Sequence, residues 1–279
     1  PARLMTPTMR RASRLALLSV ACRAASALST PKLAPKLTLH VYDHCPFCNR
    51  AEFLMGHLGV QYERVLHGYG RGADPDACGG TGYEPSKGPV ELTGFKMLPV
   101  LVGEGVPAPK GMQGMPESLE ICSYVAAAAE GKVAPATGRG DLDDWRKRFS
   151  EAATPLIRVR IPKMPVVDWA DPRDAAYARW KYESKFGFDY GAAEAATSKL
   201  LPKVSALLAE AEGLLRGTTV DGKPCLNSWG FSMDDVLLLP DLRMLSCVQG
   251  VEWPASVKGY LDAHCAAAQC KSYAEHAVP

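Results

Sequence analysis

Two cysteines two residues apart lie where a strand pattern gives way to a helical one. Residues 37–41 alternate apolar and polar side chains, which is the period-2 pattern of a half-buried strand. After Cys45-Pro-Phe-Cys48, apolar residues recur at helical spacing up to Gly59, a residue type that commonly ends a helix. Residues 60–66 read as a second strand. The sequence therefore predicts a βαβ unit whose helix begins at the two cysteines.

Cys45 is the candidate reactive thiol of this pair. Disulfides are attacked by thiolates, and the unpaired N–H groups and positive dipole at a helix start stabilise such an anion. Cys48 lies one turn further on and can reach back to resolve a mixed disulfide. The alternative is half of a zinc site, but structural zinc usually takes four ligands and the chain has no second CxxC motif. We therefore expect redox chemistry and no metal.

The first residues of the chain have an unusual composition. Basic residues recur from Arg3 onwards, Ser and Ala are frequent, and the first acidic residue is Asp43. This composition is typical of an organelle transit peptide, here residues 1–35. A secretory signal is the alternative, although Arg23 interrupts its cleavage zone. The prediction is a mitochondrial protein, with the plastid as the alternative compartment.

Composition narrows the remaining possibilities. Hydrophobic residues make up 47% and charged residues 22%, as in ordinary soluble globular proteins, and a net charge of +2 gives no case for nucleic-acid binding. No segment approaches the ~20 apolar residues of a membrane-spanning helix. The 9 cysteines are an odd number without a repeating framework, which argues against a disulfide-stapled secreted domain.

A length of 279 residues suits two domains after a short leader. The first is expected at 36–130 as an α/β domain, with a Gly-rich insertion at about 70–88 that contains Cys78. A Pro-, Gly- and Ala-rich linker follows at 131–140, and an all-helical domain at 141–275. Further elements are expected as strands at 97–102 and 111–115 and helices at 118–129, 141–149, from 172, 192–215, 232–247 and 254–270.

Met97-Leu-Pro-Val100 places a proline inside an apolar, strand-like run. Proline removes a donor from a strand ladder, so this position needs a reason. In thioredoxin-like folds a cis-proline faces the CxxC motif, and its neighbour offers backbone hydrogen bonds to an extended substrate. An edge-strand proline in the trans form is the alternative. With the CxxC upstream, we expect the Leu98–Pro99 bond to be cis.

Met115-Pro-Glu-Ser118 opens a helix with a carboxylate and a hydroxyl. A helix N-terminus can hold a ligand carboxylate, and Glu117 beside it can accept from a ligand ammonium group. Glu117 and Ser118 could thus hold both ends of an amino-acid zwitterion. The alternative is an ordinary helix cap.

Other residues receive structural roles. Ser232 and Asp235 are expected to form a capping box at a helix start. His44 is expected to be a solvent-exposed spectator, with stabilisation of the Cys45 thiolate as the alternative. The residues expected to be buried around the interface between the halves are Trp145, Tyr177, Trp180, Leu238 and Leu242.

The order of these motifs resembles the bacterial glutaredoxin-2 family, glutaredoxins with a glutathione-transferase-like architecture. The resemblance spans roughly residues 37–265 and includes C-terminal residues that small glutaredoxins lack. The matching stretches are Tyr42-Asp-His-Cys-Pro-Phe-Cys48, Lys96-Met-Leu-Pro-Val100, Met115-Pro-Glu-Ser118, Tyr124-Val125, Met233-Asp-Asp235, Pro240-Asp-Leu-Arg243 and Trp253-Pro254.

The resemblance implies a thioredoxin-like α/β N-terminal domain and an all-α, glutathione-transferase-like C-terminal domain. It implies glutathione-dependent reduction of protein–glutathione mixed disulfides and protein disulfides, with Cys45 as nucleophile and Cys48 as resolving thiol. The implied glutathione site comprises Pro46, Phe47, the backbone of Leu98 beside Pro99, and Glu117 with Ser118 at the γ-glutamyl end. The Gly-rich insertion departs from the family pattern.

Three alternatives stay open at this point. One is a prostaglandin-synthase-2-like enzyme, which also carries a Cys-Pro-Phe-Cys motif, and another is a glutathione-transferase-like enzyme. The third is a non-catalytic scaffold subunit of a larger organellar assembly. The expected partners are glutathione and glutathionylated or disulfide-bonded proteins, without nucleic acid, and the chain itself is expected to be a monomer or part of that assembly.

Overall fold

The computed structural model describes residues 36–70, 88–129, 133–268 and 270–279. The predicted leader, most of the Gly-rich insertion with Cys78, and the start of the predicted linker lie outside the described residues. Among the described helices, none is long and apolar enough to cross a membrane.

The βαβ unit predicted around the two cysteines is present. Strand β1 (Leu37–Val41) leads into helix α1 (Pro46–His57), and strand β2 (Glu63–Leu66) then pairs with β1 in parallel. Helix α1 ends where expected, because Gly59 adopts a φ of +66°, a conformation that costs glycine little.

The remaining strands complete a four-stranded sheet in the order β2-β1-β3-β4. Strand β3 (Val100–Gly103) is antiparallel to both β1 and β4 (Met115–Pro116). The strand predicted at 111–115 is wrong except at its last residue, since Gly111 lies in a turn with a φ of +85°. The helices of this half are α3 (Pro89–Thr93) and α4 (Ser118–Ala128).

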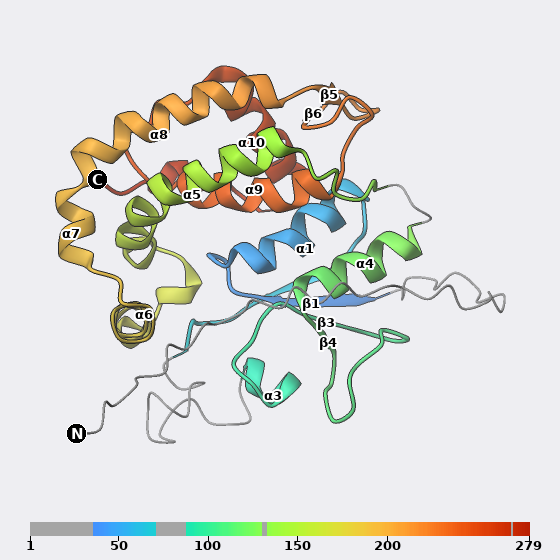
Figure 1. Cartoon of the computed structure of the whole chain (residues 1–279). Helices are drawn as coiled ribbons and strands as arrows, with labels where there is room; N and C mark the ends of the chain where they lie inside the picture. The colour runs from blue at the N-terminus through green and yellow to red at the C-terminus, as the bar shows by residue number, and fades with distance from the viewer. Residues whose placement is uncertain (1–35, 71–87, 130–132, 269) are drawn as a thin grey trace, which may run out of the picture. The chain divides into compact units, whose positions relative to one another are not determined.

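Helices α1 and α4 contact each other and cover one face of the sheet, while α3 lies on the other side (Figure 1). Strand β1 alternates as its sequence predicts: Leu37, Leu39 and Val41 are buried and the residues between them are half-buried. This alternation fixes which face of the sheet packs on α1, and so sets the position of the cysteines at the start of that helix.

The second half is almost entirely helical. Its helix starts follow local rules: Asp171 accepts from the Arg173 N–H, and the predicted capping box of Ser232 and Asp235 is present. Its elements are α5 (Gly140–Arg160), η2 (Ile161–Lys163), η3 (Val167–Trp169), α6 (Pro172–Phe186), α7 (Tyr190–Ala195), α8 (Thr197–Ala211), η4 (Glu212–Leu214), β5 (Gly217–Thr218), β6 (Pro224–Cys225), α9 (Met233–Leu245), α10 (Ala255–Ala267) and η5 (Ala274–His276).

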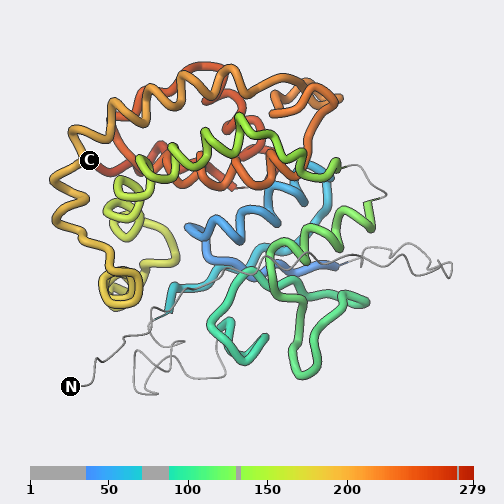
Figure 2. The backbone as a smooth tube through the Cα atoms, in the orientation of Figure 1, coloured from blue at the N-terminus to red at the C-terminus, as the bar shows by residue number. Residues whose placement is uncertain are grey.

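Helix α1 is also where the two halves meet, because it contacts α9 and α10 as well as α4 (Figures 1 and 2). Most buried apolar residues of both halves form one continuous cluster, and a small second cluster in the helical half contains Val159, Tyr190 and Ala193. Four of the five residues expected around this interface are buried. The prediction for Trp180 is wrong: 39% of this residue is exposed, and its ring stacks on that of Tyr177. Since the core is continuous, the domain limits 36–130 and 141–275 stay predictions.

Candidate active site

Cys45 occupies the N-cap position of helix α1, and Pro46 is the first helical residue. The Cys45 carbonyl accepts the first helical bond, from the Asn49 N–H at 3.0 Å. Both cysteines are free thiols; Cys45 is half-buried and Cys48 is fully buried. The structure therefore gives the two thiols unequal access to solvent.

The two thiols also differ in acidity. The pKa of Cys45 is lowered to about 7, chiefly by a hydrogen bond from the Cys48 thiol; burial opposes this, whereas His44 and the N–H groups of Cys48 and Phe47 add to it. The pKa of Cys48 is raised well above its ordinary value by burial and by its interaction with Cys45. Near neutral pH this arrangement favours the thiolate on Cys45 over the thiolate on Cys48, which keeps its proton.

Leu98 and Pro99 come immediately before strand β3, which pairs with β1. The Leu98–Pro99 peptide bond is cis, as predicted, and both residues are buried. Strand β3 begins at the next residue, Val100. The alternative of an edge-strand trans proline is therefore wrong.

Glu117 and Ser118 lie at the start of helix α4, one strand further along. The register pairs Val100 with Pro116, so Glu117 follows beside Pro99. Glu117 is exposed, its side chain does not cap the helix, and its φ is +69°. A non-glycine residue in this region is strained, and such strain concentrates at functional sites. The ordinary-cap alternative is not what the structure shows.

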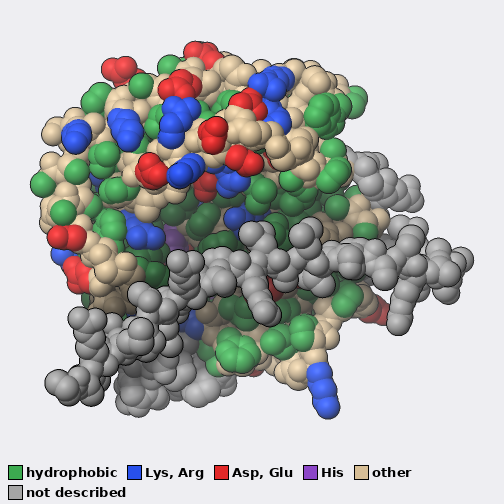
Figure 3. All heavy atoms as spheres, in the orientation of Figure 1, with side chains coloured by type: hydrophobic (Ala, Val, Ile, Leu, Met, Phe, Trp, Pro, Cys, Tyr) green, Lys and Arg blue, Asp and Glu red, His purple; other side chains and the backbone are tan. Residues whose placement is uncertain are grey.

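A cleft of about 680 Å³ opens in front of Cys45. Its lining joins Cys45, Pro46, Phe47 and Leu98 to apolar side chains of the helical half, and Figure 3 shows hydrophobic, Lys and Arg side chains in the hollow beside α6. Pro99, Glu117 and Ser118 do not line this cleft, and neither does Cys48, which is fully buried. The cleft wall thus contains four of the eight predicted site residues, and the other four lie outside it.

Charge in the cleft is mainly positive. Lys96, Arg158 and Lys181 line it together with Asp241, the one carboxylate among its described lining residues. The Lys96 ammonium lies 3.8 Å from the centre of the Tyr69 ring, within range of a cation–π interaction. The cleft is therefore suited to ligands that carry carboxylates.

His44 is not the exposed spectator that the sequence predicted. It is 5% exposed, and both its backbone N–H and its Nδ1 bond to the carboxylate of Asp168, a fully buried residue of η3. Asp168 also accepts from the Asp43 N–H at 3.0 Å. This carboxylate thus holds the turn in front of Cys45. Sequence reasoning missed Asp168, because it lies 124 residues from His44 in no motif.

A buried arginine supports the same turn from the helical half. Arg243 of α9 is 1% exposed, and its Nη1 donates to the Asp43 carbonyl at 2.6 Å and to Asn49 Oδ1 at 3.0 Å. Its Nη2 donates to the Asp43 carboxylate at 2.9 Å, and Arg64 of β2 reaches the same oxygen at 2.5 Å. The loop that carries Cys45 is therefore fixed by charges from both halves.

Among the described residues, no group of three or more His, Cys, Asp or Glu side chains is arranged to hold a metal ion.

Comparisons with known proteins match both halves of the chain. Residues 44–128 match the glutathione S-transferase N-terminal domain, and residues 141–277 match the glutaredoxin 2 C-terminal domain. Glutaredoxin 2 of Escherichia coli K12 is 26% identical over 241 residues, which cover 81% of this chain and 93% of that protein, and two further E. coli strains give the same values.

A solved structure agrees with these matches. The crystal structure of glutaredoxin 2 from Salmonella typhimurium in complex with glutathione superposes with a TM-score of 0.69 at 23% identity, covering 87% of this chain and 99% of that one. The mixed sheet, the helical second half and the thiol pair thus define a protein of glutathione-transferase-like fold. The chain belongs to the glutaredoxin 2 family.

The comparisons correct one prediction. A mitochondrial protein was expected, with the plastid as the alternative, but the curated relatives are bacterial, from cells that have neither organelle. The prediction rested on the composition of residues 1–35. A basic composition without acidic residues does not by itself specify a cellular compartment.

Proposed function

We propose that this chain reduces protein–glutathione mixed disulfides and protein disulfides at the expense of glutathione, with Cys45 as nucleophile and Cys48 as resolving thiol. Its family membership supports a glutathione-dependent oxidoreductase. The observation that supports these roles of the two cysteines is the difference between their thiols in burial and in pKa. Cys45 is half-buried and its pKa is lowered to about 7, whereas Cys48 is fully buried and its pKa is raised.

On a mixed disulfide, the Cys45 thiolate attacks the glutathione sulfur, and the protein thiolate leaves and takes a proton from solvent. A second glutathione thiolate then attacks the glutathione sulfur bound to Cys45. Glutathione disulfide leaves, and the Cys45 thiolate is restored. No step of this route needs Cys48.

On a protein disulfide, Cys45 forms a mixed disulfide with one substrate sulfur and releases the other as a thiolate. Cys48 loses its proton, attacks Cys45 and expels the substrate as its second thiolate. Two glutathione molecules then reduce the Cys45–Cys48 disulfide and leave as glutathione disulfide. The Cys48 thiol lies within hydrogen-bond reach of Cys45, which suits this step.

The proposed glutathione site runs from Cys45 across the sheet edge to helix α4. Pro46, Phe47 and the backbone of Leu98 would hold the cysteinyl part near the reactive sulfur. Glu117 and Ser118 would bind the γ-glutamyl end, since the strand register sets them beside Pro99. The Salmonella relative, solved with glutathione, supports this choice of ligand.

The direct test is turnover of hydroxyethyl disulfide with glutathione by the full chain. The proposal expects a rate well above that of glutathione alone. A correctly folded chain without turnover on this substrate or on a glutathionylated protein would instead support the scaffold alternative. No observation in the structure favours the prostaglandin-synthase-like alternative.

Glu117→Ala and Ser118→Ala should each raise the KM for glutathione while leaving the fold intact. A lost hydrogen bond to a charged ligand group costs roughly 1.5–3 kcal/mol, or about a 10- to 150-fold change in KM. Glu120→Ala is the matched control, because Glu120 is an exposed carboxylate in the first turn of the same helix. If the KM stays unchanged in both variants, these residues do not bind glutathione.

A further inference from the structure

Cys265 and Cys270 form a second pair of thiols, in the helical half and away from Cys45. Helix α10 ends at Ala267, and the Cys270 N–H donates to the Cys265 carbonyl at 3.3 Å. This bond spans the helix end in the pattern of a Schellman motif, which brings the side chain two positions beyond the cap against the one three positions before it. Those two side chains are here both thiols.

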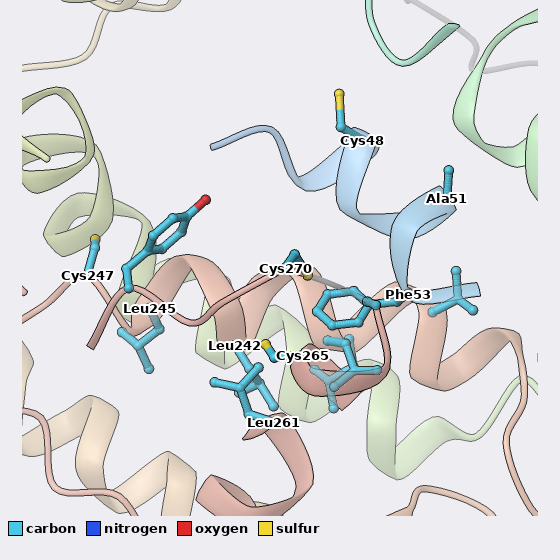
Figure 4. Packing of buried hydrophobic residues seen from close by; sticks show 14 of the residues in the cluster. Cys48, Ala51, Phe53, Leu242, Leu245, Cys247, Leu261, Cys265 and Cys270 are labelled. Carbon is cyan, nitrogen blue, oxygen red and sulfur yellow. The ribbon is translucent and has the colours of Figure 1, made fainter. Parts of the chain in front are cut away.

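The pair lies in the core but borders a cleft. Cys265 is 5% exposed and Cys270 is 2% exposed, and both belong to the main apolar cluster (Figure 4). Both also line a surface cleft of about 420 Å³ together with Lys271. Neither takes part in a disulfide in this structure. Both thiols are therefore free and lie at the wall of this cleft, almost completely covered.

The two thiols are unequal in the same sense as Cys45 and Cys48. The pKa of Cys265 is lowered, chiefly by a hydrogen bond from the Cys270 thiol; burial opposes this and the Arg243 charge adds to it. Lys258 also lowers this pKa and Asp262 raises it. The pKa of Cys270 is raised well above its ordinary value by Cys265 and by burial. Cys265 is the thiol better suited to attack.

We propose that Cys265 and Cys270 are a second redox-active dithiol, which a low-molecular-weight disulfide such as glutathione disulfide converts into an intramolecular disulfide. The Cys265 thiolate attacks one sulfur of glutathione disulfide and releases one glutathione thiolate. Cys270 then gives its proton to solvent, attacks the Cys265 sulfur and expels the second glutathione thiolate. The two cysteines are oxidised, and one glutathione disulfide is reduced to two glutathione molecules.

The position of this dithiol connects it to the candidate active site. The Lys271 carbonyl, next to Cys270, accepts from Arg243 Nε at 2.9 Å. The same guanidinium holds the Asp43 carbonyl in front of Cys45. The inference stands apart from the proposed function, because it concerns oxidation of other thiols by a reagent that is added.

Tryptic peptides allow a direct test on the folded full chain. Cleavage after Lys258 and Lys271 releases both thiols in the peptide 259–271, and cleavage after Lys36 and Arg50 releases Cys45 and Cys48 in the peptide 37–50. The chain is equilibrated with glutathione disulfide, quenched, alkylated with N-ethylmaleimide in denaturant, and digested. We expect peptide 259–271 to carry no alkyl group and to be two hydrogens lighter than the reduced peptide, as an intramolecular disulfide requires. After treatment with excess reduced glutathione, both cysteines of this peptide should be alkylated again.

Two variants sharpen the result. Cys270→Ser should trap a glutathione mixed disulfide at Cys265, and Cys247→Ser, which removes another buried thiol, should leave disulfide formation unchanged. The proposal is overturned if peptide 259–271 remains doubly alkylated while peptide 37–50 is oxidised in the same sample. It is equally overturned if the wild-type peptide stops at a glutathione mixed disulfide that never closes.

Discussion

Cys45→Ser is expected to reduce glutathione-dependent disulfide reduction to the background rate with every substrate. A serine hydroxyl does not ionise near neutral pH, so the helix start would have no nucleophile to stabilise. Cys48→Ser should behave differently. It should keep most of the activity on a glutathione mixed disulfide and lose most of the activity on a protein disulfide, because only the second route needs a resolving thiol.

Serine is the informative replacement at Cys48. Its hydroxyl can still donate the hydrogen bond that lowers the pKa of Cys45, so a change in activity reports the missing resolving thiol. Cys122→Ser is the control, because Cys122 is a buried free thiol of helix α4 with no proposed role. Both assays should be run at pH 7 on each variant. An active Cys45→Ser variant would mean that the nucleophile is assigned to the wrong residue.

Arg243→Met should lower the free energy of unfolding by about 3–5 kcal/mol, the usual cost of removing one partner of a buried ion pair. The change leaves the Asp43 carbonyl with fewer donors, and it removes one of the two arginines that hold the Asp43 carboxylate. Denaturant unfolding measures this loss. Arg148→Met is the matched control: Arg148 pairs with Glu210 on the surface, where such pairs contribute about 0–1 kcal/mol.

The effect of Arg243→Met should depend on pH. Burial tends to raise the pKa of Asp43, but Arg243 and Arg64 outweigh it, so the pKa is lowered in the folded chain. A lowered pKa stabilises the fold above the unfolded value of about 3.9 and ceases to do so as the pH falls through the folded value. The wild-type advantage should therefore be full at neutral pH and shrink in acid. A difference that grows as the pH falls would contradict this account of the network.

The reactive end of the site could be predicted from sequence because its determinants are local. The alternation of residues 37–41, the helical spacing after Cys45 and the proline at position 46 all act within one βαβ unit, and the structure follows them. Predicting the cis bond before Pro99 required one non-local assumption, namely that this proline faces the cysteines. The capping box at Ser232 is again local.

What could not be predicted depends on contacts between distant segments. Asp168 reaches His44 and Arg243 reaches Asp43 because the helical half packs against helix α1, and no spacing in the sequence encodes either contact. The same limit applies to the exposure of Trp180 and to the positive φ of Glu117. Local patterns define elements, whereas packing decides which polar groups meet.

Cys45 is expected to ionise before Cys48, and the pH dependence of alkylation measures this difference. The folded, reduced chain is pulsed with iodoacetamide across a pH series, and the peptide 37–50 is sequenced to assign the label to Cys45 or Cys48. We expect Cys45 to react first, with a rate that rises through an apparent pKa of about 7. Cys48 should stay unlabelled over the same range, because burial and Cys45 raise its pKa. Faster labelling of Cys48, or a Cys45 pKa at the free value of about 8.5, would mean that Cys45 is not the activated thiol.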